Sequence, residues 1–317
     1  MEKVQCNLCG SDDAVLVATE RQHGYQILNV ICRKCTLVYA NPRLTAAEYR
    51  SFYASRYRQL YCGSSAPTAS SASNIRSRIG HIERFCRDYL LKSRRVLEVG
   101  CATGVLLANL RDRYGCEVQG IEPSIDYGHY AATEHKVAVF SGTLEEYAKQ
   151  AKTKWDLILM VHVLEHFVDP SAALRSVREL LSDDGAVYIE VPNVLWHHSF
   201  EVAHPFSFHA NSLANLTLKE GFQPLTVITH GFPRWPRVPF HLVVTAKKAA
   251  GAAALRDGPT WSRVLQMRRR GRMCAQVIEI PERMFGWIVL MMRRTLSEKA
   301  YTWLRGKAKK LYEKTNP

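Results

Sequence analysis

The chain contains 317 residues, of which 47% are hydrophobic and 23% are charged, a composition typical of globular proteins. This composition excludes a disordered, collagen-like or fibrous chain, and the sequence lacks the ~18 consecutive apolar residues of a membrane-spanning helix. The N-terminus lacks the apolar core of a signal peptide, so a cytoplasmic location is expected. The net charge of +14 is concentrated in residues 247–317, which carry a balance of +12. Such a basic segment suits an anionic partner or a solvated surface.

Composition shifts divide the chain into four segments. Residues 1–45 hold four of the nine cysteines and are expected to form a zinc ribbon. Residues 46–93 are predicted to be a helical connector or lid, with a Ser/Ala-rich stretch at 63–73 that predicts a mobile loop. Residues 94–248 are predicted to form an α/β domain, and residues 249–317 a basic helical tail.

Two C-x2-C pairs lie near the N-terminus, Cys6 with Cys9 and Cys32 with Cys35, separated by 22 residues. Each pair can grip one metal ion from a tight turn, and two such turns complete a tetrahedral thiolate site. Because all four positions are cysteines, no coordination position is left for a substrate. The spacing therefore predicts a structural zinc ion with no catalytic role.

Short apolar runs within residues 94–248 alternate with helical patterns, which is typical of βαβ units and a mostly parallel sheet. Glycine and prolines separate the last two runs, which favours an antiparallel pair. The expected fold is α/β, a seven-stranded Rossmann-like sheet of five parallel strands plus an antiparallel final pair. The predicted strands cover residues 95–99, 117–121, 137–140, 156–161, 186–191, 226–229 and 241–246.

A strand-to-helix turn that contains Glu98, Gly100 and Gly104 follows the first predicted strand. Its small residues let a ligand lie against bare backbone, and Glu122, 22 residues after Gly100, can hold ribose hydroxyls. Ala102 replaces the middle glycine of the dinucleotide pattern, and Glu98 would repel a pyrophosphate. The turn therefore favours S-adenosylmethionine over a nicotinamide dinucleotide.

Residues 94–248 resemble a class I S-adenosylmethionine-dependent methyltransferase. LEVGCATG resembles the first motif of this family, GIEPS the second, and residues 155–193 the fourth to sixth sequence blocks. Residues 32–57 are similar to the zinc-binding N-terminal regions of bacterial methyltransferases that act on sugars. The resemblance implies a methyltransferase fold and activity, and it does not cover the basic tail.

The resemblance also implies where the cofactor lies. The loop residues would line its methionine and ribose end, and Glu122 would bind the ribose diol. Residues of the SGTLEE stretch would flank the adenine, and the end of the fourth strand would lie under the sulfonium. The implied cofactor-binding residues are Glu98, Gly100, Cys101, Gly104, Glu122, Pro123, Thr143, Leu144, Glu145, Val161 and His162.

Several of the 12 histidines cluster after the fourth and fifth predicted strands. An alcohol nucleophile must lose its proton, and a histidine with a pKa near neutrality suits that task. The predicted catalytic bases are His166, then His209, then His162. A second metal site on His204 and His209 is a weaker alternative. The aromatic side chains that could cap the site, or only pack, are Tyr53 and Tyr57.

The basic tail surrounds apolar and aromatic residues with arginines and lysines, as in Met284–Met292. Nine mostly apolar residues are too short to cross ~30 Å of hydrocarbon as a helix. They could lie in a membrane interface, pack on the body or a second subunit, or contact RNA. An anionic membrane surface bound through residues 260–317 is the favoured partner of the tail, and nucleic acid is less favoured.

The expected reaction is methyl transfer from S-adenosylmethionine to a hydroxyl of a nucleotide-linked, lipid-linked or polymer-linked sugar. Two alternatives remain open. One is an RNA methyltransferase that uses the zinc ribbon and the tail to hold RNA, and the other is a cofactor-binding module without turnover. The expected location is cytoplasmic, at the inner face of the membrane if the acceptor is lipid-linked.

Overall fold

The computed structural model describes residues 1–64, 66–197, 199–233, 238–251 and 254–276. Met1–Arg269 form one unit and Arg270–Pro317 a second. Met284–Met292 lies outside the described residues, as do the later aromatic residues of the tail, so the predictions made for them stay predictions. In the part of the chain that is described, no helix has both the length and the apolar character needed to cross a bilayer.

The main sheet has seven strands in the order β10–β11–β8–β7–β4–β5–β6. The five strands from β8 to β6 pair in parallel, and β11 pairs antiparallel with both β8 and β10. This topology confirms the predicted sheet, including its antiparallel final pair. The strands are β4 (Arg95–Val99), β5 (Glu117–Glu122), β6 (Ala138–Ser141), β7 (Trp155–Val161), β8 (Leu181–Pro192), β10 (Phe222–His230) and β11 (His241–Lys248).

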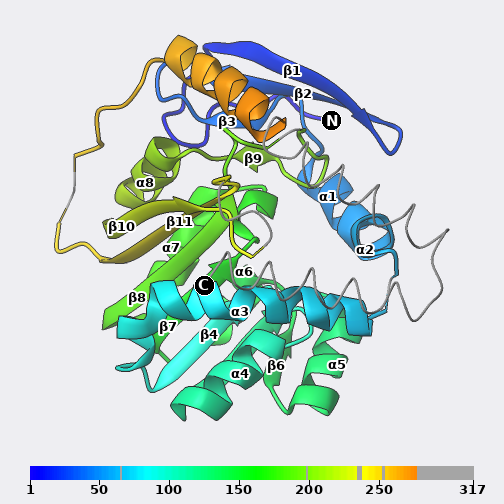
Figure 1. Cartoon of the computed structure of the whole chain (residues 1–317), viewed down its shortest axis with the longest axis vertical. Helices are drawn as coiled ribbons and strands as arrows, with labels where there is room; N and C mark the ends of the chain where they lie inside the picture. The colour runs from blue at the N-terminus through cyan, green and yellow to red at the C-terminus, as the bar shows by residue number, and fades with distance from the viewer. Residues whose placement is uncertain (65, 198, 234–237, 252–253, 277–317) are drawn as a thin grey trace, which may run out of the picture. The chain divides into compact units, whose positions relative to one another are not determined.

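Helices cover both faces of this sheet, which explains why its central strands are apolar almost throughout. One face packs on α3 (Ala69–Leu90), α4 (Val105–Tyr114) and α5 (Ile125–His135), which lie side by side in Figure 1. The other face packs on α6 (Leu144–Gln150), α7 (Pro170–Leu180) and α8 (Ala210–Lys219).

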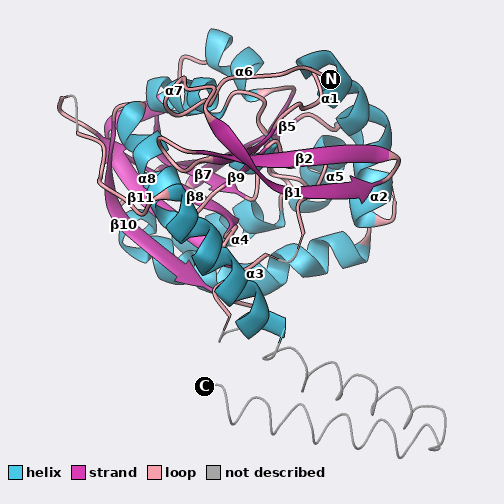
Figure 2. Ribbon diagram, turned by 90° about the horizontal axis from the view of Figure 1, so that it is seen from above, coloured by secondary structure: helices cyan, strands magenta, loops and turns pink. Residues whose placement is uncertain are grey.

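The N-terminal segment forms a four-stranded sheet that the α/β domain completes. Its strands are β1 (Ala14–Gln22), β2 (Tyr25–Cys32), β3 (Val38–Ala40) and β9 (Phe206–Ser207). The last strand comes from the segment between β8 and α8, and Figures 1 and 2 together show the β1–β2 hairpin lying over one end of the main sheet. The buried cysteines share an apolar cluster with α7 and α8. The ribbon is therefore packed into the same unit as the sheet.

The connector between the two sheets is helical over most of its length. It contains α1 (Ala46–Phe52), a π-helical turn η1 (Tyr53–Tyr57) and α2 (Arg58–Cys62). The predicted loop at 63–73 is too long, because α3 already begins at Ala69. Alanine has the highest helix propensity, so a small-residue stretch can extend a helix as readily as a loop.

A close contact inside the sheet generates the first prediction. A Cβ atom on Gly120 in β5 would collide with the Cys101 side chain, 2.8 Å from its Cβ and nearer still to its Sγ. We expect Gly120→Ala to lower the free energy of unfolding by about 1–3 kcal/mol, since overpacking forces neighbours out of place. Chemical denaturation measures this change.

The matched control is Gly80→Ala in α3, where a new Cβ meets no atom within 4 Å. Alanine should stabilise this helix position by roughly 0.5–1 kcal/mol. Equal effects of the two substitutions would contradict the predicted contact.

Candidate active site

The loop between β4 and α4 contains residues with a left-handed backbone conformation, and its glycines are closely packed. Gly100 and Gly104 both have φ +73°, and Ala102 has φ +46°. A Cβ on Gly104 would lie 2.8 Å from Ala131 Cβ, and one on Gly100 would lie 3.0 Å from Val163 Cγ2. For an alanine the left-handed conformation costs about 1–2 kcal/mol. Such local strain is characteristic of functional loops.

Glu122, at the end of β5, braces this loop and is only 3% exposed. Its Oε2 accepts the Ala102 N–H at 2.9 Å, and its Oε1 accepts the Ser124 N–H at 3.0 Å. Arg58 from α2 donates to the same Oε1 at 3.0 Å, and its guanidinium lies 3.9 Å from the ring centroid of Tyr127. The predicted ribose-binding acid is therefore paired with an arginine that the sequence patterns did not single out.

Glu98 lies within β4 and is 5% exposed. Its Oε2 has no hydrogen-bond partner among the described residues. Burial, with a smaller effect of the Glu122 charge, raises the pKa of the Glu98 carboxyl to about 8. A buried carboxyl without a partner is costly, and an ammonium group placed here would satisfy it. The residue thus fits the amino end of a cationic amino-acid cofactor.

The other predicted cofactor residues lie along the same edge of the sheet, with mixed roles. Thr143 caps α6 through a reciprocal pair of hydrogen bonds with Glu146. Leu144 is 2% exposed and packs in the core. Cys101, also 2% exposed, packs against Gly120. The remaining positions are Pro123, exposed after β5, and Glu145 and Val161, both half-buried.

His162 follows β7 directly and also has a left-handed backbone, with φ +52°. Its N–H donates to the Glu190 carbonyl at 2.7 Å, and its Nε2 lies 3.1 Å from Glu190 Oε1. Its Nδ1 lies 3.5 Å from Glu165 Oε1. Burial alone would raise the pKa of the Glu165 carboxyl, but His162, with His166 and His204, holds it at about 2. Glu165 is therefore an ionised carboxylate with histidine side chains around it.

His166 ends the short 3-10 helix η2 (Leu164–His166) and is fixed by two oxygens. Its Nδ1 lies 2.9 Å from the Ala203 carbonyl and 3.0 Å from the Tyr53 hydroxyl. A carbonyl can only accept, so we assign the proton to Nδ1 and the lone pair to Nε2. Burial lowers the pKa of His166, which keeps the ring neutral at pH 7. The ring of Tyr57 lies edge-on to it, with centroids 5.5 Å apart.

His209, the second predicted base, is not brought to these residues. It is 3% exposed, and its Nε2 lies 3.2 Å from the Thr36 carbonyl and 3.1 Å from the Thr36 hydroxyl. His204 lies instead beside His166, with ring centroids 4.7 Å apart. The predicted metal pair of His204 and His209 is therefore wrong, because His209 serves the contact between the ribbon and α8.

Several residues that the sequence patterns did not single out surround Glu190. This carboxylate is fully buried, and His81 from α3 contacts it at 3.1 Å. His230 and His241 are opposite one another in the β10–β11 register and lie next to it. One signal was present in the sequence: Glu190 is the lone acid in the apolar run of residues 186–191.

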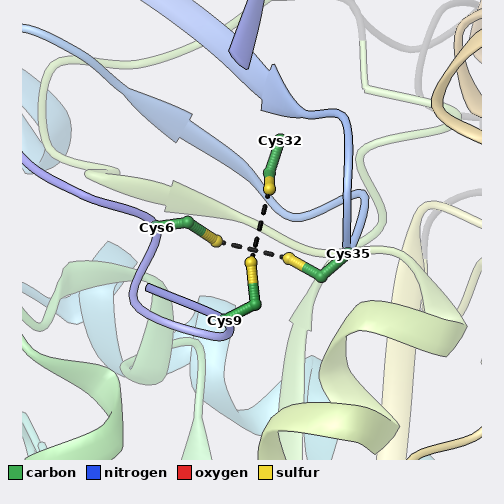
Figure 3. A group of neighbouring side chains, drawn as sticks. All are labelled: Cys6, Cys9, Cys32 and Cys35. Carbon is green, nitrogen blue, oxygen red and sulfur yellow. Dashed lines mark hydrogen bonds between the residues drawn. The ribbon is translucent and has the colours of Figure 1, made fainter. Parts of the chain in front are cut away.

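The four N-terminal cysteines converge, as Figure 3 shows. Cys6 Sγ lies 3.3 Å from Cys35 Sγ, and Cys9 Sγ lies 3.5 Å from Cys32 Sγ. These separations exceed the ~2.0 Å of a disulfide and approach the ~3.8 Å edge of a tetrahedron with zinc–sulfur bonds of ~2.3 Å. The donor set and its arrangement fit a structural zinc ion.

The first cysteine turn also holds the active-site segment in place. Asn7 donates its side-chain N–H to Asp169 Oδ1 at 2.9 Å and accepts the Ser171 N–H at 3.2 Å. Lys219 of α8 donates to the Asn7 carbonyl. Because α7 begins at Pro170, the ribbon fixes the chain directly after the segment that carries His166.

Comparisons with known proteins agree with this geometry. Residues 72–227 match a family model described as a methyltransferase domain. Ubiquinone biosynthesis O-methyltransferase from Alkalilimnicola ehrlichii is 34% identical over 108 residues, which is 32% of this chain and 43% of that protein. The Yersinia enterocolitica protein of the same name is 29% identical over 117 residues, 33% of this chain and 48% of that protein. The chain thus spans about half the length of the curated relatives it matches.

A solved structure shares the fold. The Burkholderia thailandensis 1,6-didemethyltoxoflavin-N1-methyltransferase, solved with 1,6-didemethyltoxoflavin and S-adenosylhomocysteine, superposes with a TM-score of 0.54. The match has 18% sequence identity and covers 68% of this chain and 97% of that one. At this identity the likeness concerns the fold alone.

Proposed function

We propose that this chain, whose residues 72–227 carry a class I methyltransferase domain, transfers a methyl group from S-adenosylmethionine to a hydroxyl of a small ring-shaped acceptor. The observation that carries the proposal is His166, a half-buried neutral imidazole whose Nε2 holds the lone pair at the ligand-binding edge of the sheet. The curated relatives are named O-methyltransferases, which supports an oxygen acceptor.

The loop and the two buried carboxyls would hold the cofactor. Glu98 would accept the ammonium group of its methionine part, and the left-handed backbone at Gly100 and Gly104 would leave room beside it. Glu122 would bind the ribose diol, and those hydroxyls would replace or share its contact with Arg58. The adenine would lie near Pro123 and the residues 143–145, and Val161 and His162 would lie under the sulfonium.

When bound, S-adenosylmethionine supplies an electrophilic methyl group on a positively charged sulfur. The chain must align the acceptor oxygen with that carbon and exclude water, which can supply several kcal/mol. His166 Nε2 would take the hydroxyl proton as the oxygen–carbon bond forms. Tyr53 and the Ala203 carbonyl hold the ring in the required tautomer. His162 would contribute position rather than proton transfer, because Glu190 and Glu165 occupy its nitrogens.

The aromatic residues beside His166 indicate the class of acceptor. Tyr53 and Tyr57 form an aromatic wall beside His166, which suits the flat face of a pyranose or a phenol. Sequence resemblance favours a sugar hydroxyl, and the relatives found are named for ubiquinone biosynthesis. A methyl-transfer assay with a nucleotide sugar, a catechol and an RNA oligonucleotide separates the three acceptor classes. Transfer to none of the three would count against the proposed acceptor classes.

The role of His166 is tested by His166→Gln. We expect kcat to fall by about 10²–10⁴-fold, because a general base is lost, with cofactor affinity unchanged. His129→Gln, an exposed histidine on α5, is the control and should keep full activity. A His166→Gln enzyme with normal kcat would remove this residue from the chemistry.

The role of Glu98 is tested by proton release during cofactor binding. Since its pKa is raised to about 8, the carboxyl is protonated at pH 7 and must ionise to pair with an ammonium group. Calorimetry at pH 7, in buffers of different ionisation enthalpy, should therefore detect up to about one proton released per cofactor bound. Affinity should also rise as the pH approaches 8.

Glu98→Gln should abolish the proton release and weaken binding by about 1–3 kcal/mol. Glu134→Gln, an exposed acid on α5, provides the comparison and should behave as the wild type does. The same proton release from Glu98→Gln and wild type would show that the proton comes from another group.

We further infer that the cysteine cluster holds one structural zinc ion per chain. Cys9→Ser should lose one zinc equivalent by elemental analysis and lower the thermal midpoint, since metal binding contributes to folding free energy. Cys274→Ser alters an exposed thiol outside the cluster and should retain the metal. Equal zinc contents in the two variants would disprove the assignment.

A further inference from the structure

We propose that Glu190, His81 and His230 form a second metal site, for a divalent transition-metal ion, distinct from the cysteine cluster. The site goes beyond the proposed methyl transfer, which requires no metal. The three side chains come from β8, α3 and β10, so only the folded chain brings them together.

The spacing of the donor atoms fits a metal ion. His81 Nε2 lies 3.1 Å from Glu190 Oε2, and His230 Nε2 lies 3.7 Å from the same oxygen. One donor atom from each of the three residues lies within 4.8 Å of the others. Ligands about 2.0–2.2 Å from a tetrahedral ion are about 3.4 Å apart, which falls between these two distances.

The hydrogen bonds of this cluster leave His230 without a partner among the described residues. Glu190 accepts the Tyr188 hydroxyl at 2.6 Å, and His81 can donate its Nε2–H to the carboxylate. Both ring nitrogens of His230 lack a hydrogen-bond partner among the described residues, although its side chain is only 4% exposed. Leaving such a group unsatisfied costs about 1–3 kcal/mol. A metal ion bound at His230 Nε2 would satisfy it.

The donor chemistry selects the class of metal. Two imidazoles and one carboxylate suit zinc, cobalt or nickel, whereas magnesium and calcium prefer oxygen ligands. The other carboxylate oxygen faces His162 Nε2 at 3.1 Å, and His241 forms a separate group of donors with His162 and Glu190. An ion on Glu190 would therefore fix the carboxylate that orients His162 at the end of β7. The role of the ion would be to position the side chains at this edge of the sheet.

The test uses Co²⁺ as a spectroscopic probe on the full chain, with the cysteine cluster first loaded with zinc. We expect one further Co²⁺ to bind, with visible ligand-field bands and no thiolate-to-cobalt charge-transfer band. His230→Gln and His81→Gln should each weaken this binding at least about tenfold. His129→Gln, at an exposed histidine of α5, should bind as the wild type does.

Two outcomes would overturn the site. One is a wild-type chain that binds no Co²⁺ beyond the zinc-loaded cluster. The other is binding that is equal in wild type, His230→Gln and His81→Gln. Should one variant fail to fold by circular dichroism, the other variant and the wild-type titration still decide. Added zinc should also raise the thermal midpoint of the wild type more than that of either variant that folds.

Discussion

Four buried carboxyls at one edge of the parallel sheet are the constraint on which the rest of the structure depends. Glu98, Glu122, Glu165 and Glu190 come from, or directly follow, the adjacent strands β4, β5, β7 and β8, and none is more than 5% exposed. Burying an unpaired charge costs several kcal/mol, so each carboxyl must find a partner or take up a proton. A concentration of negative charge also suits a cofactor that carries a cationic sulfur and an ammonium group.

The partners of these carboxyls come largely from outside the strands that carry them. Arg58 from the connector pairs with Glu122, and His81 from α3 contacts Glu190. Imidazoles surround Glu165, while Glu98 has no partner for one oxygen. The connector, α3 and the sheet therefore form one electrostatic system, in which the unpaired carboxyl oxygen of Glu98 marks the place for a ligand.

The ribbon supports the candidate active site by fixing the positions of α7 and α8. Its first turn holds the start of α7 through Asn7, and its second turn meets α8 through Thr36 and His209. The segment between these two helices carries β9 and Ala203, the carbonyl that fixes the tautomer of His166. A change at the cysteine cluster should therefore reach the candidate active site without any direct contact between them.

The sequence by itself determined the seven strands of the main sheet, their parallel and antiparallel directions, the cysteine spacing and the loop acid Glu122. Each of these follows from local periodicity or from a fixed distance along the chain. Only the tertiary structure decided which histidines meet: His209 joined the ribbon, while His81, His230 and His241 gathered on Glu190. Residues as far apart in the chain as His81 and Glu190 meet only when a helix packs on the sheet. No local pattern encodes the direction in which an imidazole then points.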